Sequence, residues 1–168
     1  MDTYNNMHND IKRGKLAETR VADLLIASGY EVSWSPKGCK EHDLMVKKGR
    51  KKFTVEVKYD LMAAKTSNIA IEYHNPKSNI PSGISATKSN IWAHCIKDDD
   101  NIVVFIAATA ALVEWVATQT PKRIVELGGD ANASLALYDM DTILDRIFVR
   151  IDDQTPTEIE KIIKRTLK

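Results

Sequence analysis

Residues 53–60 decide the fold, and they read Phe53-Thr54-Val55-Glu56-Val57-Lys58-Tyr59-Asp60. Apolar and polar side chains alternate along this stretch, which is the pattern of a β-strand with one buried face. The polar face carries Glu56 and Lys58, which stand about 6.6–7 Å apart at ~3.3–3.4 Å per residue. At this spacing, we expect the carboxylate and the ammonium to act on one site without closing into a single contact ion pair.

A second strand is predicted at Asp43–Lys47, just before the strand predicted at Lys52–Tyr59. The residues Lys48-Gly49-Arg50 between them favour a tight turn, so the two strands should pair antiparallel. Antiparallel pairing brings the start of the first strand beside the end of the second. Asp43 and Glu56 therefore come close together, and their two carboxylates can share a metal ion.

A third acidic residue, Glu18, lies on a predicted helix, Leu16–Ser28. Apolar and small side chains recur there with helical spacing, and Gly29 ends the pattern. The buried stripe consists of Ala17, Val21, Leu24, Leu25 and Ser28. Glu18 borders this stripe, so its side chain could reach over the sheet toward Asp43 and Glu56.

The remaining pattern predicts an α/β protein with a central mixed sheet flanked by helices. Further strands are predicted at Tyr30–Ser35, Asn68–His74, Asn101–Ala107, Arg123–Leu127, Ser134–Tyr138 and Phe148–Ile151, with a loop at Asn75–Gly83. Further helices are predicted from Thr87 to about Ile96, at Ala108–Thr118 and at Asp141–Arg146. A last helix should follow Thr155 as N-cap, with Pro156 first, a capping box through Glu158, and a core stripe of Ile159, Ile162, Ile163 and Leu167.

The length of 168 residues suits one domain, and 43% of the residues are hydrophobic. We expect a single domain at 13–168, preceded by a polar, frayed segment at 1–12. The longest nearly uninterrupted apolar stretch, Ile102–Val113, is too short for a membrane span of roughly 20 residues. No secretory signal is evident, and two cysteines are too few for a disulfide scaffold. These features predict a cytoplasmic protein that does not enter a membrane.

Charge is unevenly distributed although the net charge is only +1. Residues 37–65 contain nine basic and four acidic residues, whereas residues 98–160 contain thirteen acidic and four basic residues. A concentrated basic segment can attract a polyanion locally without a basic isoelectric point. Taken alone, this segment is more typical of a lysine-rich turn kept soluble by its charge.

The order of a helix glutamate, an aspartate and a Glu-x-Lys strand resembles the PD-(D/E)XK, or restriction-endonuclease-like, nuclease superfamily. The matching residues are Glu18, Asp43 and Glu56-Val57-Lys58, separated by 25 and 13 positions. These spacings are similar to those of archaeal-type Holliday-junction resolvases and small phage nucleases. The resemblance covers roughly residues 14–60, and His42 stands where the family often has proline.

The resemblance implies a core of order αβββαβ and a metal-dependent endodeoxyribonuclease, which could be phage-encoded. Asp43, Glu56 and the backbone carbonyl of Val57 would bind Mg²⁺, for which Mn²⁺ should substitute. Lys58 would orient or deprotonate the attacking water or stabilise the transition-state charge, and Glu18 would hold a second metal or a metal-bound water. The resemblance also implies a homodimer, and leaves open the DNA structure cleaved, endo- or exonucleolytic attack, and one or two metals.

The segment Ser82–Trp92 is similar to a stretch that follows the core motif in some small nucleases of this superfamily. If Thr87 caps a helix, the free backbone amides and Lys88 would form an anion site suited to a DNA phosphate. The alternative is an ordinary capped helix that buries Trp92 and Ile96.

Several other interpretations of the same residues remain. The chain could be a nucleic-acid-binding or assembly protein that has lost the chemistry, or an RNA endonuclease of the same superfamily. His42-Asp43 could belong to an HD-type phosphohydrolase, but such a site needs further histidine and aspartate ligands on helices. Cys39 lacks an evident base to activate it. Glu72 could be a further metal ligand, although a structural or solvent-facing role fits better.

Overall fold

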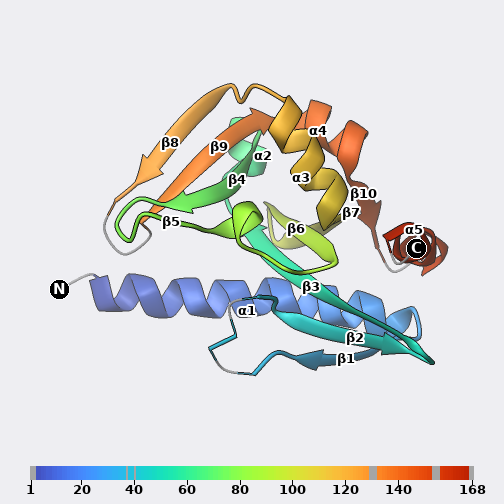
Figure 1. The fold of residues 1–168 in the computed structure, drawn as a ribbon. Helices are drawn as coiled ribbons and strands as arrows, with labels where there is room; N and C mark the ends of the chain where they lie inside the picture. Colours follow the sequence, from blue (N-terminus) through green and yellow to red (C-terminus); the bar gives the residue numbers. More distant parts are fainter. Residues whose placement is uncertain (1–2, 37, 40, 129–131, 153–155, 167–168) are drawn as a thin grey trace.

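The computed structural model describes residues 3–36, 38–39, 41–128, 132–152 and 156–166. Two β-sheets form its framework (Figure 1). The first sheet has the spatial order β1 (Glu31–Trp34), β2 (Leu44–Lys48), β3 (Lys51–Asp60), β6 (Ile91–Asp98), β7 (Asn101–Ala108) and β10 (Val149–Ile151). Strands β3 and β6 pair parallel and the other neighbours antiparallel, so this is the mixed sheet that the sequence predicts.

The second sheet has four strands and lies against one face of the first sheet. Its spatial order is β5 (Ile80–Pro81), β4 (Asn68–Asn75), β9 (Ala133–Asp139) and β8 (Arg123–Leu127), all antiparallel. The short helices α2 (Ala63–Thr66), α3 (Thr109–Thr118), α4 (Met140–Ile147) and η1 (Gly83–Ser85) lie on this side.

Two hydrophobic cores lie on the two faces of the first sheet, and the second extends only over β6 and β7. Helices α1 (Thr3–Ala27) and α5 (Pro156–Thr166) bury one face, where they enclose Leu44, Val46, Phe53, Val55 and Val57. The second core lies between the two sheets and contains Trp92, Ile96, Ile69, Ile71, Leu112, Tyr138 and Ile143. Strand β3 therefore turns its apolar side chains toward α1 and its polar ones toward the second sheet.

The segment predicted as a helix from Thr87 to Ile96 is a strand, so that prediction is wrong. Strand β6 runs from Ile91 to Asp98 and pairs parallel with β3. Every residue from Ile91 to Ile96 is buried, because this strand is covered on both faces. A strand covered on both faces shows a continuous apolar run in place of alternation, and such a run cannot be told from a buried helix by periodicity.

The other strands and helices that were predicted are confirmed, their ends agreeing within one residue except at the N-terminus. Helix α1 begins at Thr3, so it extends through most of the segment expected to be frayed. Short elements within and beside the predicted loop Asn75–Gly83, namely β5 and η1, were not predicted. The implied order αβββαβ is seen in α1, β1, β2, β3, α2 and β4; β5 and η1 then precede strand β6.

Within the last helix, Ile159, Ile162 and Ile163 are buried as predicted. Thr155, Leu167 and the side chain of Glu158 lie outside the described residues. Among the helices in the described ranges, none is both long enough and apolar enough to cross a membrane.

The carboxylate of Asp60 joins the end of β3 to the second sheet. Its Oδ1 accepts hydrogen bonds from the backbone N–H groups of Met62 (2.9 Å) and Ala63 (2.8 Å), and its Oδ2 accepts one from Ala70 (3.1 Å). Nε2 of buried His94 lies 3.5 Å from Oδ2. Burial opposes the charge of Asp60, but the His94 contact and the backbone donors outweigh it and lower the pKa of this carboxyl below its usual 3.8.

We expect Asp60→Asn to lower the free energy of unfolding by ~1–3 kcal/mol at pH 7, because an amide nitrogen cannot accept the Ala70 hydrogen bond. A group whose pKa is depressed by folding stabilises the protein above its unfolded pKa, and this contribution is lost as the pH falls through the folded pKa. Urea denaturation should therefore show the difference between wild type and variant shrinking below pH 3.8. A difference that stays constant down to pH 2 would contradict this role.

Candidate active site

A cavity of about 360 Å³ opens between the ends of β2 and β3 and the β4–β5 hairpin of the second sheet. Polar and charged side chains dominate its floor. It is lined by Cys39, His42, Asp43, Glu56, Lys58, Asn75, Ile80, Pro81, Ser82, Gly83, Ala86 and Thr87. The structure thus places Asp43, Glu56, Lys58 and Thr87, four of the predicted site residues, around one cavity.

Asp43 is fixed at the entrance to β2 by hydrogen bonds to the neighbouring strand. Its backbone N–H donates to the carbonyl of Val55 (2.9 Å), and its Oδ2 accepts from the N–H of Val57 (2.8 Å). The side chain therefore lies against β3 beside Glu56, as the antiparallel pairing predicts. No partner is recorded for its Oδ1 among the described residues, which leaves an oxygen available to a ligand.

Glu56 and Lys58 form an ion pair of 2.7 Å between Oε1 and Nζ. The expectation that they would not close into a contact pair is therefore wrong, because the two side chains bend toward each other within the cavity. Glu56 is only 9% exposed, so its charge needs a compensating partner. Thr87 adds its hydroxyl, 3.5 Å from Oε2 of Glu56.

The electrostatics of the cavity oppose the ionised form of Glu56. Burial raises the pKa of its carboxyl above 4.5, and the charge of Asp43 adds to this, while Lys58 and Thr87 act in the opposite direction. For Lys58, burial opposes the ammonium, but Glu56, Glu72 and Asp43 outweigh burial and raise its pKa above 10.5. The cavity therefore combines a charged lysine with two carboxylates that repel each other.

The hairpin wall of the cavity depends on a close approach that only glycine permits. Gly83 has φ of +50°, and a Cβ at this position would lie 2.2 Å from the carbonyl oxygen of Glu72. This contact holds η1 against β4 and brings the following residues Ala86 and Thr87 to the cavity. The sequence did not predict the wall residues Asn75, Ile80 and Ser82. Its prolines and glycine indicated only a loop at Asn75–Gly83.

Thr87 and Lys88 do not form the anion site predicted at a helix N-terminus, because no helix begins there. The hydroxyl of Thr87 instead lies 3.1 Å from Ser89 Oγ, which in turn lies 3.1 Å from Thr109 Oγ1. Lys88 is exposed, forms an ion pair with Glu41 and does not line the cavity. Thr87 lines the cavity, but the helix that it was predicted to cap is absent, and its contact with a phosphate stays a prediction.

Glu18 also lies outside the cavity. Its carboxylate forms an ion pair with Lys15 (2.9 Å), whose ammonium lies 4.5 Å from the ring centre of Trp34. Helix α1 packs on the face of the sheet opposite to Glu56 and Lys58. The predicted approach of Glu18 to the other two carboxylates is therefore not seen in this structure.

The carboxylates of Asp43 and Glu56, which line one open cavity, could together hold a hard divalent cation. Mg²⁺ is commonly bound by one or two carboxylates, with waters and substrate phosphate oxygens completing its octahedron. Within the described part of the chain, no cluster of three or more His, Cys, Asp or Glu side chains is placed to hold a metal ion. The donor set of Asp43 and Glu56 thus fits Mg²⁺ in a substrate complex better than a closed structural metal site.

No protein-family model matches the sequence, and no curated protein sequence matches it. Among solved structures, the chain is similar to the bacterial homing endonuclease I-Ssp6803I, with a TM-score of 0.50. The two chains share a fold. Their sequences are 12% identical, and the likeness covers 61% of this chain and 70% of that chain. The likeness agrees with the mixed α/β architecture that the sequence predicts.

Replacing Lys58 by methionine should raise the pKa of Glu56 further, because the ammonium is the main group that favours the carboxylate. Carboxyl ¹³C chemical shifts, followed by NMR from pH 3 to pH 8 without added metal, measure this directly. The carboxyl of Asp139, whose pKa of about 2 reflects Lys122 and Thr142, should stay ionised over this range in both proteins and serves as the reference signal. An unchanged midpoint for Glu56 would show that the pair is not coupled in solution.

Proposed function

We propose that the protein is a metal-dependent endodeoxyribonuclease of the PD-(D/E)XK superfamily that hydrolyses DNA phosphodiester bonds inside the cell. The observation that carries this proposal is that Asp43, Glu56 and Lys58 line one cavity. The nuclease-like fold supports it, since the similar structure is an endonuclease. Phosphodiester hydrolysis needs charge neutralisation at the phosphate and a positioned water, and these three side chains can provide both.

In this proposal Asp43 and Glu56 hold Mg²⁺, which Mn²⁺ can replace, with the carbonyl of Val57 as a further ligand. When bound, the cation neutralises phosphate charge and lowers the pKa of a coordinated water. Glu56 then no longer needs Lys58 as its sole counter-charge. The ammonium of Lys58 would then orient the attacking water and stabilise the charge that develops on the phosphate.

The remaining residues have supporting parts in the proposal. The hydroxyl of Thr87, at the cavity wall, would donate to a phosphate oxygen, and exposed Lys88 would attract the DNA backbone from outside. Glu18 would contribute a second metal ligand, or hold a metal-bound water, only if α1 moved from the opposite face of the sheet and the pair with Lys15 broke. A homodimer would place two such cavities on the two strands of a duplex, and sedimentation of the protein with and without DNA tests this arrangement.

Asp43→Ala should abolish both Mn²⁺ binding and DNA cleavage, because it removes a ligand that β3 holds in place. Lys58→Ala should retain Mn²⁺ binding, since an ammonium is no ligand, but should cleave at less than about a hundredth of the wild-type rate. Calorimetric Mn²⁺ titration and Mg²⁺-dependent plasmid nicking measure the two effects separately. Asp145→Ala and Lys97→Ala, which change exposed residues of α4 and β6, are the matched controls.

The opposite outcomes identify the alternatives. Wild-type protein that binds DNA but does not cut it with Mg²⁺ or Mn²⁺ would be a binding or assembly protein on this fold. Cleavage of RNA alone in a matched panel of DNA and RNA substrates would make it a ribonuclease. Wild-type Mn²⁺ affinity in Asp43→Ala would refute the ligand assignment.

A further inference from the structure

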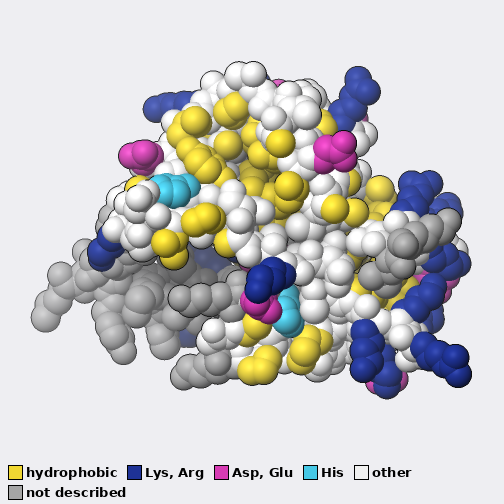
Figure 2. Space-filling view, in the orientation of Figure 1, with side chains coloured by type: hydrophobic (Ala, Val, Ile, Leu, Met, Phe, Trp, Pro, Cys, Tyr) yellow, Lys and Arg dark blue, Asp and Glu magenta, His cyan; other side chains and the backbone are white. Residues whose placement is uncertain are grey.

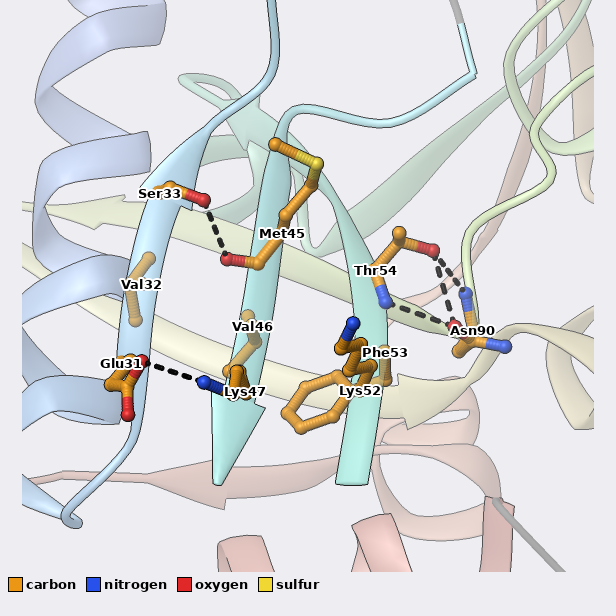
Figure 3. Close-up of a pocket in the computed structure, with 10 residues that line it drawn as sticks. All are labelled: Glu31, Val32, Ser33, Met45, Val46, Lys47, Lys52, Phe53, Thr54 and Asn90. Atoms are coloured by element: carbon orange, nitrogen blue, oxygen red, sulfur yellow. Dashed lines mark hydrogen bonds and ion pairs between the residues drawn. The ribbon is translucent and has the colours of Figure 1, made fainter. Parts of the chain in front are cut away.

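The outer face of strands β1, β2 and β3 carries polar side chains that neither hydrophobic core covers (Figure 3). Strand alternation turns the apolar residues toward α1 and the others outward. A hollow of about 570 Å³ lies on this three-stranded region, called the ribbon below. Its outward side chains are Glu31, Ser33, Met45, Lys47, Lys52 and Thr54.

The ribbon is continuous with the candidate active site through β3. Thr54, Glu56 and Lys58 share one face of this strand, with neighbours about 6.6–7 Å apart. Asn90 fixes the junction, because its Oδ1 accepts from the N–H of Thr54 (2.9 Å) and its own N–H donates to the carbonyl of Thr54 (3.1 Å). A ligand that follows the ribbon face is therefore led into the cavity that holds Glu56.

The ribbon projects beyond the body of the sheet. Strand β6 begins at Ile91, opposite Val55, so the first residues of β3 have a strand partner only in β2. Strand β1 begins at Glu31, opposite Lys47, so the tip of the β2–β3 hairpin is two-stranded. The major groove of DNA, about 12 Å wide, admits a two-stranded β-ribbon.

The charge of the hairpin fits a polyanion. Five of the six residues from Lys47 to Lys52 are basic, and Figure 2 shows Lys and Arg side chains gathered where Figure 1 places the hairpin tip. Lys48 is paired with Glu160 (2.7 Å) and Lys47 more loosely with Glu31 (3.4 Å). No ion pair is recorded for Arg50, Lys51 or Lys52 within the described residues, so these three cations are available to phosphates.

We propose that the two-stranded tip of the ribbon enters the major groove of duplex DNA, and that the outer face of the ribbon leads the bound strand to Glu56 and Lys58. Lys52 on the outer face and Arg50 at the exposed tip contact phosphates, while Met45 and Thr54 face the bound strand. Lys52 lies four residues before Glu56, about 13 Å along the strand. The ribbon thus contacts the duplex about 13 Å from the cleaved bond, an inference that rests on the proposed nuclease function.

Binding of a fluorescent 30-base-pair duplex in EDTA tests the ribbon without any cleavage. Met45→Glu places a negative charge at the centre of the face and should weaken binding about tenfold or more. The same change at Ile124, which is exposed on β8 of the other sheet, is the control and should leave binding unchanged. Thermal unfolding verifies that both variants remain folded.

The salt dependence of binding tests the phosphate contacts. Arg50→Gln/Lys52→Gln should reduce the slope of log K against log salt concentration by about 1–2, at ~0.9 for each lost phosphate contact. Lys97→Gln/Arg123→Gln, which removes two cations distant from the ribbon, should leave the slope unchanged. Netropsin, which occupies the minor groove, should not displace the protein.

Failure of this inference is distinct from failure of the proposed function. If wild type cleaves DNA with Mg²⁺ while the ribbon variants bind like wild type, or if netropsin displaces the protein, the ribbon proposal is overturned alone. If wild type binds through the ribbon but never cleaves, the ribbon contacts stand and the nuclease function is overturned.

Discussion

A carboxylate buried as deeply as that of Glu56 has to be compensated, and this requirement organises the centre of the molecule. Lys58 provides the opposite charge from the same strand, and Thr87 provides a hydroxyl from the far wall. Asp43 adds a second negative charge, but it is stabilised by the backbone N–H of Val57. A group of charges that includes two repelling carboxylates stabilises the free protein poorly, yet it suits a cation that replaces the repulsion with attraction.

The second sheet makes this arrangement possible because its β4–β5 hairpin forms one wall of the cavity. Asp60 links the end of β3 to α2 and β4 through three backbone N–H groups, so the wall is tied to the strand that carries Glu56 and Lys58. Gly83 then brings η1 against β4 at a distance that no side chain would allow. The hydrogen bonds of Asp60 and the close approach of Gly83 to Glu72 thus set the position of the wall, while the cavity itself stays open.

The sequence was sufficient for strands β2 and β3 because each buries one face, and burial of one face imposes alternation. Together with the turn at Gly49, alternation placed Asp43, Glu56 and Lys58 near one another without any tertiary information. It could not foresee the contact ion pair, because strand spacing locates Cα atoms and not the ends of flexible side chains. Strand β6 was predicted wrongly for the complementary reason. It is covered on both faces, so its sequence does not alternate, and His94 lies buried within it beside Asp60.

The position of Glu18 shows a further limit of periodicity. The helical repeat gives the angle of a side chain around α1, and Glu18 does border the buried stripe, but its reach depends on where the helix lies along the sheet and on its local partner Lys15. Periodicity also does not predict which part of an outward strand face is covered by other elements. The alternation that buries Phe53, Val55 and Val57 against α1 necessarily turns Thr54, Glu56 and Lys58 outward, and β6 and the second sheet cover only the later part of that row. One face of β3 therefore packs into the core. Its other face is an open polar surface before Val55, where pairing with β6 begins, and lines the charged cavity after it.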